Sequence, residues 1–293
     1  MTGLSAWLIQ RRAIRVALMV VLFPLPLTLV LSAAIVVLTT GMKGWRDALQ
    51  DCAVALSVLV ALTAASGGGW VEIGLGAALT WLLAVLLGAL RNAVSLALAV
   101  QVAVLIGMAA AIGFALWVRD TQAFWERVLM DLAERASSAG LVVEPAEFVP
   151  GAAQLMTGLM SASAVMSSVV ALLLGSAWGD PARGRDFGSE FRELRMGRTL
   201  TLLAGVLVVL LFTGLGTLAD DLLLVLAAGF VLQGLALVHW HGHARQWPRL
   251  WPLALYLPMA LLPAAAVLEL TGLAILGLLD NLLGLRRGGR DPA

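Results

Sequence analysis

Long apolar stretches dominate this chain and decide what it can fold into. A helix needs about 20 mostly apolar residues to cross the hydrocarbon core of a bilayer. Apolar residues make up 61% of the chain and charged residues 13%, against about 45–50% and about 25% in soluble domains. The sequence therefore predicts an all-α, polytopic transmembrane helix bundle that forms a single domain over residues 1–293. Seven crossings are readily placed, near residues 48–66, 72–90, 93–118, 151–177, 199–217 and 221–240 and within 250–285.

Two apolar stretches leave the number of crossings between about 8 and 10. Residues 13–40 form either one long helix or two short helices that meet at Phe23-Pro24-Leu25-Pro26, because proline removes a backbone donor and disfavours a continuous helix. Residues 250–285 are too long for one crossing and contain Gly272. A hairpin is the alternative there.

The positions of Lys and Arg favour ten crossings, because short cytoplasmic loops are enriched in these residues. With both stretches unsplit and the N-terminus inside, nine of the 19 cations are cytoplasmic and ten are external, which is no bias. With both stretches split, only Arg119, Arg127 and Arg135 are external and the other sixteen are cytoplasmic. Arginine far outnumbers lysine, which favours a GC-rich bacterial genome. We therefore expect a bacterial inner membrane protein with both termini in the cytoplasm and an uncleaved first helix.

The segment 119–150 is the one sizeable hydrophilic stretch, and this topology places it outside the cell. Its apolar residues recur at helical spacing, as in Phe124, Trp125, Val128 and Leu132, while charged residues occupy the other positions. That pattern predicts an amphipathic helix lying on the outer membrane surface. It serves either as a connector resting on the bundle or as a lid or partner-binding element.

The segment 178–198 is predicted to be a cytoplasmic loop and is rich in charge. Arg192 and Arg195 stand three residues apart, and Phe191 and Leu194 lie between the charges. This spacing is typical of a short interfacial helix that leads into the next crossing. Contact with lipid headgroups explains such a segment, and binding of an anion or a protein partner is the alternative.

Ionisable and amide side chains inside the crossings are few, and each is a functional candidate because it is costly in hydrocarbon. They are Asp51, Glu72, Gln101, Gln154, Gln233, Glu269 and Asp280. Several lie close to the predicted ends and can reach water, and Gln101, Gln233 and Asp280 are the strongest candidates. Hydrogen bonding between helices is the structural alternative to ligand contact. A buried Asp280 needs a cationic or donor partner, and Arg192, Arg195 and His239 are expected at a similar depth.

The sequence contains no pattern of a known catalytic or cofactor site. It has no Ser-His-Asp order, HExxH pair or phosphate-binding loop, and nothing indicates nucleic-acid binding. His239 and His243 would share one helical face, yet no nearby Asp, Glu or Cys supplies a third metal ligand. We expect no catalytic residue, no metal and no cofactor.

Three short stretches together resemble the YybS-like family of bacterial multi-pass membrane proteins, whose function is unknown. They are residues 190–195 (Glu-Phe-Arg-Glu-Leu-Arg), 233–239 (Gln-Gly-Leu-Ala-Leu-Val-His) and 278–281 (Leu-Leu-Asp-Asn) running to Arg286. That family resembles the substrate-binding components of energy-coupling-factor vitamin transporters. The resemblance implies a ligand near the outer face and contact with a coupling subunit through small residues near the first crossing, where Ala13 and Ala17 lie.

Three functions follow as hypotheses. The first is a non-enzymatic substrate-binding or transport-like protein, with a small-molecule ligand that the sequence does not identify. A closed polar cavity lined by Gln101, Gln233 or Trp81 would favour it. The second is a scaffold or assembly factor whose Arg-rich loops bind a membrane or cytoplasmic protein, favoured by a solid bundle with exposed cytoplasmic motifs. The third is an enzyme acting on a lipid, which would require His239, Asp280 and Arg192 in one pocket.

Overall fold

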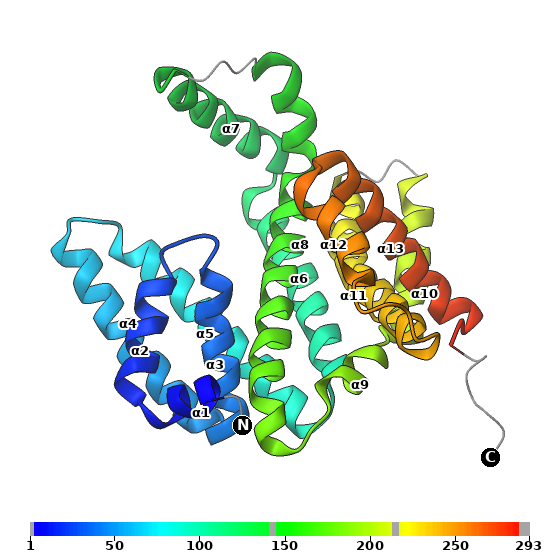
Figure 1. Cartoon of the computed structure of the whole chain (residues 1–293). Coiled ribbons are helices and arrows are strands. Elements are labelled where there is room, and N and C mark those ends of the chain that lie inside the picture. The colour runs from blue at the N-terminus through cyan, green and yellow to red at the C-terminus, as the bar shows by residue number, and fades with distance from the viewer. Residues whose placement is uncertain (1–2, 141–144, 213–216, 287–293) are drawn as a thin grey trace. The chain divides into compact units, whose positions relative to one another are not determined.

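The computed structural model describes residues 3–140, 145–212 and 217–286, and every regular element among them is helical. Figure 1 shows the helices in chain order. Their bounds are α1 Gly3–Gln10, α2 Arg12–Leu22, α3 Leu29–Lys43, α4 Trp45–Ala65, α5 Trp70–Ala93, α6 Leu96–Val118, α7 Thr121–Ser138, α8 Pro145–Gly179, the 3-10 turn η1 Asp180–Arg183, α9 Phe187–Arg192, α10 Gly197–Leu211, α11 Thr217–Ala244, α12 Trp251–Leu261 and α13 Pro263–Leu283.

The described residues contain seven helical segments long and apolar enough to cross a membrane. Two further apolar helices, α3 and α12, are shorter. The seven are α4, α5, α6, Val149–Arg183, Phe187–Leu211, α11 and α13. The prediction of an all-α, multi-pass membrane protein is therefore confirmed.

Both ambiguous stretches are split into two helices. Residues 13–40 break between α2 and α3, around the two prolines, and the hydroxyl of Thr28 donates to the carbonyl of Leu22 across the break at 2.8 Å. Residues 250–285 break at Leu262, where Pro263 begins α13. Gly272 lies inside α13, so its proposed role as the hairpin position is wrong. Proline at the first helical position is favourable because its missing N–H has no helical partner there.

The chain divides into two compact units, Met1–Ala103 with Met166–Leu194 and Val104–Val165 with Arg195–Ala293. In unit 1, α3 forms the core: its residues 32–40 are all buried. Trp81 of α5 is 1% exposed, and its indole N–H donates to the hydroxyl of Ser32 at 3.0 Å. The ring of Phe23 packs edge-on against Trp81. Unit 1 is thus centred on one fully enclosed helix.

In unit 2, α10, α11, α12 and α13 lie alongside one another (Figure 1). The closest approach joins α11 and α13 at two glycines. A Cβ on Gly234 would lie 2.0 Å from the carbonyl oxygen of Leu273, and one on Gly277 would lie 2.1 Å from that of Phe230. Only glycine allows backbones to approach this closely. These two glycines therefore set the spacing of α11 and α13.

The predicted amphipathic helix is present as α7. Asp120 caps its N-terminus by accepting a hydrogen bond from the backbone N–H of Ala123 at 2.9 Å. Ala133 is buried, whereas Val128 and Leu132 are 41% and 60% exposed. The apolar side chains of α7 therefore do not form one buried face, because Ala133 is covered while Val128 and Leu132 are exposed. The end of the segment 119–150 is helical as well, because α8 begins at Pro145 and contains Pro150.

The direction in which the helices cross the membrane is testable by labelling. On a background with Cys52 replaced by serine, a cysteine at position 185 is expected to react with a membrane-impermeant maleimide only after the cells are opened. A cysteine at position 130 of α7 is expected to react in intact cells. Labelling of position 185 in intact cells would contradict the ten-crossing topology, and intact-cell labelling at 130 is the internal control.

Candidate functional site

The six candidates from the sequence fall in both units. Gln101 of α6 and Arg192 of α9 belong to unit 1, whereas Arg195, Gln233, His239 and Asp280 belong to unit 2. Within unit 2, Gln233 and Asp280 come together. Both are 0% exposed.

Gln233 uses both ends of its amide inside unit 2. Its Nε2 donates to Asp280 Oδ2 at 2.8 Å and to Asn281 Oδ1 at 3.0 Å, while its Oε1 accepts the backbone N–H of Met196 at 2.7 Å. Asn281 in turn donates to the hydroxyl of Thr201 at 3.0 Å. The network joins α11 and α13 to the start of α10. Gln233 therefore acts as an interhelical connector.

Asp280 has the cationic partner that its burial requires, and that partner is Arg286. Arg286 Nη2 lies 2.9 Å from Asp280 Oδ2, and both side chains are almost completely buried, at 4% and 0% exposure. Arg192, Arg195 and His239 were nominated from the sequence for this role. Arg286 follows Asp280 by six residues, past the left-handed Gly284 that ends α13. The chain reversal after the helix lets the arginine reach the carboxylate.

All three histidines lie within α11, which ends at Ala244. His239 Nδ1 lies 2.9 Å from the carbonyl oxygen of Leu235, and its ring packs edge-on against Trp251 with centroids 4.8 Å apart. Among the residues that the structure describes, no group of three or more His, Cys, Asp or Glu side chains could hold a metal ion.

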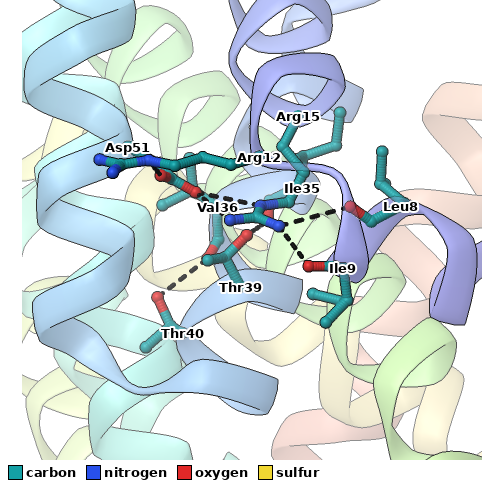
Figure 2. Close-up of polar contacts among 9 residues, drawn as sticks. All are labelled: Leu8, Ile9, Arg12, Arg15, Ile35, Val36, Thr39, Thr40 and Asp51. Carbon is teal, nitrogen blue, oxygen red and sulfur yellow. Dashed lines mark hydrogen bonds and ion pairs between the residues drawn. The ribbon is translucent and has the colours of Figure 1, made fainter.

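Unit 1 contains a buried ion pair (Figure 2). Its acid, Asp51, is a candidate from the sequence, whereas its pairing with Arg15 was not predicted. Arg15 is 1% exposed and Asp51 is 2% exposed. Arg15 donates to Asp51 Oδ2 from Nε at 3.0 Å and from Nη2 at 2.7 Å, and Arg12 donates to Oδ1 at 2.7 Å. Arg15 also bonds to the carbonyl oxygens of Leu8 and Ile9 at the end of α1. One side chain thus joins α1, α2 and α4.

A second buried ion cluster in unit 1 surrounds Arg91 of α5. Its Nη1 donates to Asp180 Oδ1 at 3.1 Å, and its Nη2 pairs with Asp180 and with Glu190. Glu190 also accepts the backbone N–H of Leu96 at 3.0 Å. Arg91 is 4% exposed and Asp180 is 1% exposed. The cluster ties η1 and α9 to the end of α5.

The charged segment 184–192 of unit 1 is locally ordered. Asp186 caps α9, and hydrogen bonds from the backbone N–H groups of Ser189 and Gly188 hold the pKa of its carboxyl below the ordinary value. Arg192 lies 3.9 Å from Asp186 at the surface. The short helix expected before the next apolar helix is present as α9; its position at the membrane interface stays a prediction.

Beside Arg91 lies a small polar cavity. The space open to the centre of a water molecule is about 10 Å³, which is room for about one such molecule. Its lining comes from α3, α5, α8 and η1 and consists of Val37, Leu38, Gly41, Gly88, Arg91, Asn92, Gly175, Ser176, Gly179, Asp180 and Arg183. Two buried atoms that belong to lining residues, Ser176 Oγ and Arg91 Nε, have no hydrogen-bond partner among the described residues. Arg183 Nη1 donates to Asn92 Oδ1 at 2.6 Å.

The comparisons with known proteins add no relative. No family model matches the chain, and neither a curated protein nor a solved structure matches it. The similarity to the YybS-like family remains a proposal. What the chain does must be argued from its own residues.

Proposed function

We propose that this multi-pass membrane protein is a non-enzymatic scaffold of the bacterial inner membrane that binds a protein partner through the segment 184–198. The observation that supports this choice is the use of the polar side chains inside the bundle. Gln233 and Asp280, the strongest ligand candidates, are fully buried and bonded within unit 2. The indole N–H of Trp81 likewise donates to the hydroxyl of Ser32. None of these three residues lines the cavity beside Arg91.

The segment 184–198 offers charge to a partner. Four charged side chains of this segment are exposed, namely Arg185, Glu193, Arg195 and Arg198. Leu194 and Met196 lie between them and are buried, each with 1% of its surface exposed. The alternation anchors the backbone and turns the charges outward. Exposed arginines are frequent in protein interfaces because the planar guanidinium pairs with carboxylates in a fixed geometry.

Replacing Arg185 and Arg198 together by glutamine is expected to abolish complementation of a deletion strain while leaving protein abundance normal. The reason is the loss of two partner-facing charges without loss of any buried contact. The matched control replaces Arg127 and Arg135 of α7 by glutamine, which is the same change of charge on the predicted outer side. Complementation by the first variant, or equal loss in the control, would refute partner binding through this segment.

A substrate-binding or transport-like function is the second candidate, in line with the YybS-like resemblance. One observation favours it, namely the cavity beside Arg91 with its two unpartnered polar atoms. It lies elsewhere than Gln101, Gln233 and Trp81, the residues expected to line such a cavity. No observation favours an enzyme acting on a lipid.

A further inference from the structure

The cavity beside Arg91 exists because four of its lining residues have no side chain. Gly41, Gly88, Gly175 and Gly179 bring α3, α5 and α8 close together. A Cβ on Gly175 would lie 2.5 Å from the carbonyl oxygen of Ala34, and one on Gly41 would lie 3.4 Å from Arg183 Nη1. The helices are therefore packed as tightly as glycine permits, and the remaining space is lined by polar atoms.

The two unpartnered atoms of the lining residues are both donors. Ser176 Oγ carries a hydroxyl hydrogen and Arg91 Nε an N–H. A buried donor without a partner costs about 1–3 kcal/mol. An occupant that restores both bonds must supply an acceptor atom. The volume admits one atom of about the size of a water oxygen.

The charges around the cavity indicate the charge of the group to which this acceptor atom belongs. Arg91 is matched by Asp180 and Glu190. Arg183 instead donates to the neutral amide of Asn92. The charges of Arg185 and Arg91 repel it, and those of Asp180 and Glu190 attract it. Arg183 and Asn92 are partly exposed, whereas Arg91, Ser176 and Asp180 are buried. The cavity therefore opens beside Arg183, a cation with no carboxylate in hydrogen-bonding contact among the residues that the structure describes.

We propose that this cavity binds one oxygen of a phosphate group, with Arg183 at its entrance supplying the charge. The phosphate comes either from an anionic lipid headgroup or from free phosphate. The position agrees with both sources, because α5 ends at Ala93 and α8 at Gly179, the depth at which headgroups meet a span. Basic pockets between helices at such ends bind lipid headgroups. The proposal deepens the second candidate function and does not depend on partner binding, since Arg198 and Arg185 do not line the cavity.

The test measures binding to the purified full-length protein, using inorganic phosphate and nanodiscs that contain phosphatidylglycerol or only a phosphate-free galactolipid. Stabilisation against heat by phosphatidylglycerol alone assigns the site to a lipid headgroup, and stabilisation by inorganic phosphate as well assigns it to free phosphate. Replacing Arg183 by glutamine is expected to weaken the observed binding about tenfold or more, the effect of a lost charge-assisted hydrogen bond.

Two further variants keep the result interpretable. Ser176→Val retains every charge but fills the cavity and removes a donor, so it is expected to weaken binding similarly. Arg46→Gln makes the same charge change at an exposed position of unit 1 outside the lining, and it should bind like the wild type. Wild-type binding by both cavity variants, equal weakening by Arg46→Gln, or no stabilisation by either phosphate source would overturn the proposal and leave water as the occupant.

Discussion

Replacing Asp51 by alanine is expected to lower the free energy of unfolding by about 3–5 kcal/mol, the usual effect of removing one member of a buried ion pair. Arg15 would be left charged and 1% exposed, with only the carbonyls of Leu8 and Ile9 as partners. Equilibrium unfolding in mixed micelles measures the change. Because Arg15 joins α1, α2 and α4, these helices should lose protection from hydrogen exchange first.

Two controls separate the buried charge from the ion pair as such. Arg12→Gln removes a cation whose side chain is 52% exposed, so it is expected to cost no more than about 1 kcal/mol. The double variant Arg15→Met with Asp51→Leu removes both buried charges and should recover most of the stability. An Asp51→Ala variant as stable as Arg12→Gln would show that Arg15 reaches water and that this burial argument fails.

Gly234→Ala is expected to destabilise the contact of α11 with α13 by about 1–3 kcal/mol or more, the range for overpacking a tight interior. The new methyl group would lie 2.0 Å from a carbonyl oxygen and 3.0 Å from a Cα of Leu273. These are backbone atoms, so the helices must move apart. Thermal unfolding measures the loss, and an engineered disulfide between α11 and α13 would form more slowly.

Gly272→Ala is the matched control for that substitution. Gly272 lies on α13 itself, and a Cβ there would meet nothing within 4 Å. Alanine is the better helix former by about 1 kcal/mol, so the control should be neutral or slightly stabilising. Equal destabilisation by both alanines would mean that glycine matters for the helix itself and not for the crossing.

Much of the secondary structure could be predicted from local pattern. The break at Pro24 and Pro26, the amphipathic α7 and the short α9 all follow from signals that lie within a few residues. The break in residues 250–285 was predicted at Gly272, which instead lies inside a continuous helix, on a face where no neighbouring atom is close. Pro263, which starts α13, was the stronger signal. Pro150 shows the converse, since a proline near a helix N-terminus does not end it.

The polar clusters were only half predictable. Asp51, Gln233 and Asp280 stand out in apolar stretches, so their cost in hydrocarbon marks them. Their partners depend on which helices pack together, and the local spacing of residues in the sequence does not determine that. Arg91 was placed in a short loop between two crossings. The structure extends α5 to Ala93 and buries the arginine against Asp180 and Glu190, acids about a hundred residues away along the chain.

The shortness of α12 has a consequence for the surrounding lipid. With 11 residues at roughly 1.5 Å each it is about 16 Å long, against a hydrocarbon core of about 30 Å. None of its residues is fully buried, although α13 packs along it. In the ten-crossing topology that the sequence predicts, α12 would be too short to span this core, and the bilayer would have to thin locally beside it. That topology therefore also predicts that the protein concentrates in thinner regions of its membrane.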